Sequence, residues 1–310
     1  MSFAELQLSA RSMNESEKGV VLALMAHLVW GGMALYFGLI RHISPAEIAV
    51  HRGLWSLPIA AFIVWYLGQH RDVLAVLAKP RTLALLALTS SLIVFNWGFY
   101  VWSIQEGRTL ESSLGYFINP LLNVVMGYVF LGERFTMPQK LALGLAAIAV
   151  LIQTVALGHF PWLGLMLAVT FCLYGFLRKT ISVGPTQGFF IEVAIVALPL
   201  IGAQAWLVSR GEAHFGGTVF DTSMLIGCGV MTAASLMLFA SSIRRIRYST
   251  AGLLQYISPS LVFLTAVFIF GEPLDTLKLV SFVIIWAGLG IFSVAAIRDE
   301  RNRRQDVAPV

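Results

Sequence analysis

Two ionisable side chains lie inside long apolar stretches of this sequence. Arg52 lies inside the second span if that span begins near Glu47, and Glu192 interrupts another apolar stretch. A charge in hydrocarbon costs roughly 3 kcal/mol or more, so such residues usually face a cavity or an opposite charge. A guanidinium in this position can bind a carboxylate or a phosphate. A buried carboxylic acid can carry a proton, because burial favours its neutral form.

Both residues also have a simpler interpretation. Arg52 could extend back to the outer lipid headgroups. Glu192 could be an interfacial carboxylate that is solvated or paired with Arg178 or Lys179. We favour solute binding for Arg52 and pairing for Glu192, and we keep Glu192 as a candidate for proton coupling.

Histidine offers proton chemistry near neutral pH. His27 lies in the first apolar stretch, and we take it as the second proton-coupling candidate. The alternative is a histidine that only hydrogen-bonds to a neighbouring helix. The six histidines and two cysteines do not show the spacing of a metal site, so we expect no metal and no cofactor.

Several polar and aromatic residues fall on helix faces that could line a solute pocket. Asn96 and Tyr100 are four residues apart and share a face. These residue types suit an aromatic or amphipathic solute, although helix packing and interfacial belts use them too. The predicted substrate-binding set is Trp30, Arg52, Asn96, Tyr100, Phe117, Asn119, Gln255 and Tyr256.

These residues belong to a chain of unusual composition. Of its 310 residues, 58% are hydrophobic and 12% are charged, whereas soluble proteins are about half apolar and about a quarter charged. This composition excludes an ordinary soluble enzyme, a disordered chain and a disulfide scaffold. There are no paired carboxylates on one helix face and no Ser/His/Asp set, so we expect no catalytic residues and no enzyme.

The apolar stretches predict an all-α polytopic membrane protein with ten transmembrane helices. A helix needs about 20 apolar residues to cross a bilayer. The stretch Leu141–Leu177 is long enough for two spans and turns at Gly158–Pro161. The stretches are Gly19–Ile40, Gly53–His70, Thr82–Gln105, Ser112–Gly132, Leu141–Leu177, Thr180–Ser209, Thr222–Ile243, Tyr248–Gly271 and Leu279–Ile297.

The basic residues predict the orientation of these spans. With a cytoplasmic N-terminus, 16 Lys and Arg residues fall on cytoplasmic segments and 4 in outer loops. This asymmetry is typical of membrane proteins. An even number of spans then places both termini in the cytoplasm. The net charge of +5 therefore reflects topology, and we expect no nucleic-acid partner.

An internal repeat divides the chain. The segment from Tyr116 to Pro120 and the segment from Gln255 to Pro259 are similar at an offset of 139 residues, and each is followed by an apolar run that ends in Gly-Glu, at Glu133 and Glu272. Two halves of five spans each enter the membrane in opposite directions, a plan that recurs in transporters. The predicted segments are an N-terminal tail at 1–17, repeats at 18–156 and 157–297, and a C-terminal tail at 298–310.

Several motifs between Lys18 and Ile297 match a known family. They are Ile48–Arg52 with Trp55–Pro58, Asn96-Trp97, Gly107-Arg108, Glu111–Leu121, Gly132–Arg134, Gly252–Pro259 and Gly271–Pro273. On these residues the chain resembles the RarD branch of the EamA family, within the drug/metabolite transporter superfamily. The resemblance implies a ten-helix inner-membrane permease for small metabolites or drugs.

The expected function is a secondary transporter that moves small metabolites or drug-like solutes across a bacterial-type inner membrane by alternating access. The sequence contains no nucleotide-binding loop for ATP-driven transport. The alternatives are an uncoupled facilitator and a non-transporting membrane sensor or scaffold. The expected partners are a small-molecule substrate and the lipid bilayer, and a homodimer is compatible with these spans.

Overall fold

A computed structural model describes residues 13–105, 108–271 and 276–306, and these residues form helices and connecting turns only. Glu272, the second acid of the sequence repeat, lies outside them. The first half contains α2 (Glu15–Leu39), α3 (Pro45–Leu54), α4 (Ser56–Tyr66), α5 (His70–Leu77), α6 (Pro80–Gln105), α7 (Thr109–Leu131) and α8 (Met137–Leu157).

The described residues of the second half form α9 (Trp162–Thr180), α10 (Pro185–Ser209), α11 (Val219–Ile243), α12 (Tyr248–Leu254), α13 (Ile257–Phe268) and α14 (Thr276–Asp306). The last of these helices, α14, continues beyond the membrane span into the predicted C-terminal tail.

The ten predicted spans are confirmed, because ten helical segments are long and apolar enough to cross a membrane. The predicted turn within Leu141–Leu177 is also confirmed. α8 ends at Leu157, Gly158 adopts φ +76°, and α9 begins at Trp162. Glycine suits that left-handed conformation because it has no Cβ.

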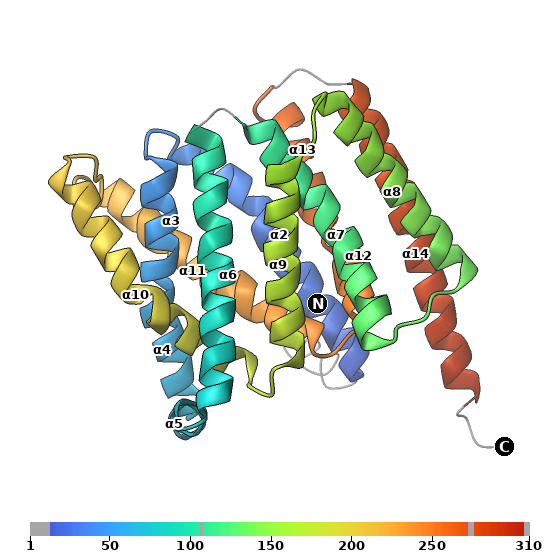
Figure 1. The fold of residues 1–310 in the computed structure, drawn as a ribbon, viewed down its shortest axis with the longest axis horizontal. Helices are drawn as coiled ribbons and strands as arrows, with labels where there is room; N and C mark the ends of the chain where they lie inside the picture. Colours follow the sequence, from blue (N-terminus) through green and yellow to red (C-terminus); the bar gives the residue numbers. More distant parts are fainter. Residues whose placement is uncertain (1–12, 106–107, 272–275, 307–310) are drawn as a thin grey trace, which may run out of the picture.

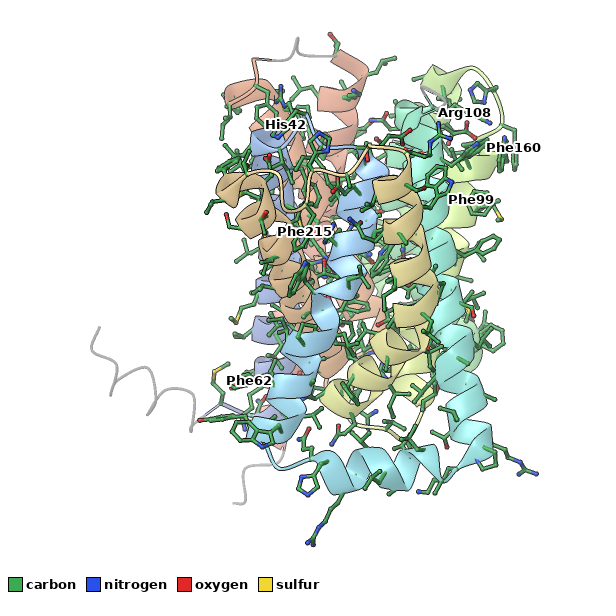
Figure 2. All side chains as sticks on the ribbon, turned by 90° about the vertical axis from the view of Figure 1, so that its left-hand side faces the viewer. His42, Phe62, Phe99, Arg108, Phe160 and Phe215 are labelled. Atoms are coloured by element: carbon green, nitrogen blue, oxygen red, sulfur yellow. The ribbon has the colours of Figure 1, made fainter. Side chains whose placement is uncertain are left out.

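The start of α2 and the end of α14 lie at the same end of the bundle, which we call the terminal end (Figure 1). The other end is the far end. The short helix α5, which the sequence analysis did not predict, lies across the terminal end (Figure 2). Its Val73 and Val76 are buried, whereas Leu74 and Leu77 are exposed.

Helix packing follows a twofold pattern between the two halves. In the first half α2, α3 with α4, α6, α7 and α8 are spans one to five, and α9, α10, α11, α12 with α13, and α14 are their counterparts. α2 packs on α11 and α13, just as α9 packs on α6 and α7. Three pairs of counterpart spans also pack on each other. They are α3 and α4 with α10, α7 with α12, and α8 with α14, which lies at one flank of the bundle (Figure 1). This pattern is that of two inverted five-helix repeats.

Prolines distinguish the two halves. Pro58 follows a break between α3 and α4 at Trp55, while Pro199 lies inside the continuous helix α10. Conversely, Pro120 lies inside the continuous helix α7, while Pro259 follows a break between α12 and α13. A proline removes one backbone hydrogen bond and weakens the helix at that point. Each of these two pairs of related spans therefore has one continuous and one interrupted member.

Candidate functional site

Arg52 lies near the end of α3, roughly 10 Å along the helix from Pro45 by helical rise. Its Nε donates a hydrogen bond to Oγ1 of Thr232 at 3.1 Å. The guanidinium carbon lies 5.1 Å from the centre of the Trp97 ring and 5.9 Å from that of Phe37. Within the described residues, no carboxylate pairs with Arg52.

Two tyrosines complete the surroundings of this cation. The rings of Tyr100 and Tyr116 meet edge to face with centres 6.2 Å apart. Both tyrosine side chains lie close enough to Arg52 to affect its charge. Tyr116 is 48% exposed although it lies well inside a span. The set that we call the arginine site consists of Phe37, Arg52, Trp97, Tyr100, Tyr116 and Thr232.

The break after α3 positions Arg52 against α11. Oγ of Ser56 donates hydrogen bonds to the carbonyl oxygens of Arg52 at 2.6 Å and of Gly229 at 3.1 Å. A Cβ on Gly229 would lie 2.6 Å from the backbone carbonyl carbon of Trp55, so only glycine allows this approach. Thr232 lies one helical turn after Gly229 and therefore deeper in the bundle, so the guanidinium points inward rather than toward the far end.

Glu192 has three partners from two other helices. Its carboxylate lies 3.4 Å from Nε of Arg178 and accepts hydrogen bonds from the hydroxyls of Thr89 at 2.6 Å and Tyr174 at 3.4 Å. Arg178 is 1% exposed and Glu192 is 3% exposed. Arg178 also donates to the carbonyl oxygen of Pro185 at 3.0 Å. These contacts join α6, α9 and α10 near the terminal end.

His27 is fully buried in the middle of α2. Its Nδ1 lies 3.2 Å from Oγ of Ser258, which donates a hydrogen bond to the His27 carbonyl oxygen at 3.1 Å. Its Nε2 has no hydrogen-bond partner among the described residues. The ring packs against Trp30, with centres 5.2 Å apart, and against Phe239. Thus Trp30 belongs to an aromatic cluster with His27, and not to the arginine site.

Asn96 takes part in helix packing. Its Nδ2 donates to the carbonyl oxygen of Leu167 at 2.8 Å and to Oγ1 of Thr170 at 2.9 Å. Both acceptors are on α9. Although Asn96 shares α6 with Trp97 and Tyr100, its polar group is therefore directed at a neighbouring helix.

The four remaining predicted residues lie where α7 meets α12 and α13. Gln255 accepts a hydrogen bond from Nδ2 of Asn123 at 2.9 Å. The Tyr256 hydroxyl donates to the carbonyl oxygen of Phe117 at 2.9 Å. Asn119 is buried, and its Oδ1 has no partner among the described residues.

The predicted set is thus divided among several places. The structure brings Arg52 and Tyr100 together and separates them from the others. Four residues that were absent from the predicted set complete the arginine site, and they are Trp97, Phe37, Tyr116 and Thr232. Trp97 could have been predicted, because it lies three residues before Tyr100 and therefore on the same helix face. Thr232 carries no such signal because it comes from the other half.

Histidines and acids gather at the far end. Nε2 of His42 lies 2.8 Å from Oδ1 of Asp221, and Nδ1 of His214 lies 2.9 Å from Oε2 of Glu47. The rings of the two histidines are 5.8 Å apart. These contacts join the α2–α3 turn to the α10–α11 loop. Phe215, in the same loop, lies nearer the interior of the bundle than His42 does (Figure 2). No group of three or more His, Cys, Asp or Glu residues in the described parts of the chain is placed to hold a metal ion.

Comparisons with known proteins place this arrangement in a family. The model of the EamA-like transporter family matches residues 17–155. An uncharacterized transporter of Vibrio cholerae is 38% identical over 285 residues, which cover 92% of this chain and 94% of that protein. The protein RarD of Salmonella typhimurium is 37% identical over 294 residues, covering 93% and 99%. A solved structure with 16% identity covers 90% of this chain and 98% of its own, with a TM-score of 0.71, and shows the same fold.

Proposed function

Because the chain belongs to the RarD group of the EamA-like transporter family, we propose that it is a secondary transporter. It moves small metabolites or drug-like solutes across the bacterial inner membrane by alternating access. The multi-pass architecture and the curated relatives named as transporters support this proposal.

The observation that carries the proposal is the pair of interrupted spans. The α3–α4 break lies three residues after Arg52, and the α12–α13 break contains Gln255. Interrupted helices with polar groups at the interface of two inverted repeats are a recurring feature of transporter binding sites. The spans related to them, α10 and α7, are continuous but contain Pro199 and Pro120. If the interrupted spans became continuous and the continuous spans α10 and α7 bent at their prolines, the site would open to the opposite side of the membrane.

The proposed orientation has both termini in the cytoplasm. The terminal end then faces the cytoplasm, and the far end, with its histidines and acids, faces outward. The excess of Lys and Arg on the terminal-end segments supports this assignment.

Glu192 and His27 are the proposed proton-coupling residues. The Glu192 carboxylate is held between helices of both halves, so a change in their packing would expose it or separate it from Arg178. The Glu192→Gln variant should lose the acceleration of transport by a pH gradient, and the His27→Gln variant would show whether the histidine shares this role. Glu212→Gln, a change in an exposed pair with Arg210, is the matched control. Unchanged pH-driven transport in both buried variants would contradict coupling through these residues.

The test of transport itself is solute release from proteoliposomes. Vesicles that contain the purified protein are loaded with a mixed metabolite extract, and the released solutes are identified by mass spectrometry beside empty vesicles. Selective release of a few solutes supports the proposal. Release no greater than that from empty vesicles, with and without a pH gradient, would contradict it.

A further inference from the structure

The two charged residues at related positions of the repeats, Arg52 and Glu192, have different surroundings. Glu192 is neutralised within the protein by Arg178 and by two hydroxyl donors. The Arg52 side chain donates a hydrogen bond to the neutral hydroxyl of Thr232, and it has no acid partner among the described residues. Arg52 is half-buried, and a charge removed from water without a partner is unfavourable. Among the described residues, the arginine site therefore contains a cation and no anion.

The direction of the side chain argues against a lipid anchor. An arginine that extends to the headgroups directs its guanidinium toward the nearest membrane surface. Arg52 instead bonds to Thr232, which is fully buried near the middle of α11. Its charge is thus held inside the bundle by an interaction that leads away from the far end.

The aromatic neighbours leave part of the cation available. A guanidinium carries its N–H donors in one plane, and it stacks on aromatic faces through the surface of that plane. The rings of Trp97 and Phe37 lie within cation–π range of the guanidinium, and Nε donates to Thr232. The Nη groups at the edge are then the donors suited to a planar, two-oxygen acceptor. Tyr116, which is 48% exposed, supplies an accessible ring beside them.

We propose that the transported solute is a small organic anion with a flat unsaturated or aromatic group, and that its carboxylate or phosphate pairs with Arg52 between Trp97 and Tyr116. This inference rests on the proposed transport function. The negative charge of the solute neutralises Arg52, just as the positive charge of Arg178 neutralises Glu192 in the other half. The ring of the solute lies against the aromatic side chains of the site.

Binding without transport tests this inference separately. Thermal unfolding of the purified protein is measured in nanodiscs with benzoate, acetate, inorganic phosphate and the neutral benzamide. We expect benzoate to stabilise the protein more than acetate or phosphate, and benzamide to have little effect. The Arg52→Gln variant should bind benzoate roughly ten- to hundredfold more weakly, as expected for loss of a charge-assisted hydrogen bond.

The matched control is Arg41→Gln. Arg41 also lies over an aromatic ring, that of Phe270 at 4.3 Å, but in the turn at the far end. This variant should keep the benzoate response of the unmodified protein. Equal responses to benzoate and benzamide, no response to any of the three anions, or equal losses in both variants would overturn the inference while leaving the release assay to decide on transport.

Two further measurements separate an anion site from a structural or lipid-binding arginine. Without ligand, Arg52→Gln should unfold at a higher temperature than the unmodified protein, because an uncompensated charge is removed. A lower unfolding temperature would show a structural role and contradict the inference. Nanodiscs of zwitterionic lipid and of anionic lipid should give the same benzoate affinity. A response that appears only in zwitterionic lipid would assign the site to a lipid headgroup instead.

Discussion

At the scale of single residues, Arg178 and Glu192 are a buried pair whose two charges depend on each other. Both are almost fully buried, and Thr89 and Tyr174 bind the same carboxylate. The attraction between such charges is largely offset by their loss of hydration, but removal of one partner leaves the other uncompensated. The pair therefore matters most when it is broken on one side.

We expect Arg178→Met to lower the free energy of unfolding by about 3–5 kcal/mol, because Glu192 stays buried without its cation. Thermal unfolding of the purified protein measures this loss. The double variant Arg178→Met/Glu192→Leu should recover most of it. The control is Arg210→Met, which breaks an exposed pair with Glu212 and should cost less than about 1 kcal/mol. Equal stability of the two single variants would refute this account of the pair.

The sequence was informative about which residues carry unusual chemistry and less so about their neighbours. Arg52 and Glu192 could be found because a charge in an apolar stretch needs no structure to be noticed. The pairing of Glu192 with Arg178 was one of two alternatives, since both residues lie near the same predicted membrane surface. Thr232 could not be predicted as a partner of Arg52. That contact depends on the rotation of α11 against α3, which no local pattern encodes.

At the scale of helices, close approaches of backbone are made by glycines on α7 and α9. A Cβ on Gly164 would lie 2.6 Å from the carbonyl oxygen of Glu111, and one on Gly115 would lie 2.8 Å from the carbonyl oxygen of Gly164. Because the obstacles are backbone atoms, they cannot move aside as a flexible side chain can. Small residues at such crossings let membrane helices pack tightly.

We predict that Gly164→Ala lowers the free energy of unfolding by about 1–3 kcal/mol, the usual cost of overpacking. The measurement is thermal unfolding in detergent. Gly98→Ala is the matched change, because a Cβ there meets nothing within 4 Å. It should leave stability unchanged or slightly higher. If both variants unfold at the same temperature as the unmodified protein, the crossing of α7 and α9 has room for a Cβ, and the prediction is wrong.

Pro259 offers a test of the interrupted span. An alanine at this position could donate a hydrogen bond to the carbonyl oxygen of Gln255, at the break between α12 and α13. We expect Pro259→Ala to favour a continuous helix and to slow solute release several-fold without unfolding the protein. Pro138→Ala, in the first turn of α8, should release solute at the normal rate. Normal release by Pro259→Ala would show that the break is not needed.

Span positions followed from composition, whereas helix interruptions did not. Nine apolar stretches, of which one is long enough for two spans, predicted ten spans because the thickness of a bilayer sets the length of each. α5 is too short and too polar to give a membrane signal, and the sequence analysis did not find it. Of the four prolines in the repeat-related spans, only Pro58 and Pro259 follow a break. The presence of a proline therefore did not predict which of these spans is interrupted.

At the scale of the whole molecule, the proposed orientation makes opposite predictions for the two ends. A cysteine introduced at His159, exposed in the α8–α9 turn of the far end, should react with an impermeant maleimide in intact cells. A cysteine at Arg71, exposed on α5, should react only after the membrane is permeabilised. The native Cys172 and Cys228 are buried and give a low background. The reverse labelling pattern would invert the topology.

The inverted repeat was visible in the sequence because it retained the Pro-to-Gly-Glu spacing in both halves. The reciprocal packing of α2 with α11 and α13, and of α9 with α6 and α7, is the structural form of that repeat. The different surroundings of Arg52 and Glu192 are where the halves depart from symmetry. In the proposed mechanism, the symmetry provides two related shapes and the departure from symmetry provides the binding site.

The most direct test is the release assay, run with the unmodified protein, Arg52→Gln and Arg41→Gln in parallel, with the released solutes sorted by charge. The account predicts that the unmodified protein and Arg41→Gln release the same few organic anions, and that Arg52→Gln retains them. Release of the same solutes by all three proteins would contradict the central role of Arg52. Release by none of them above empty vesicles would contradict transport itself.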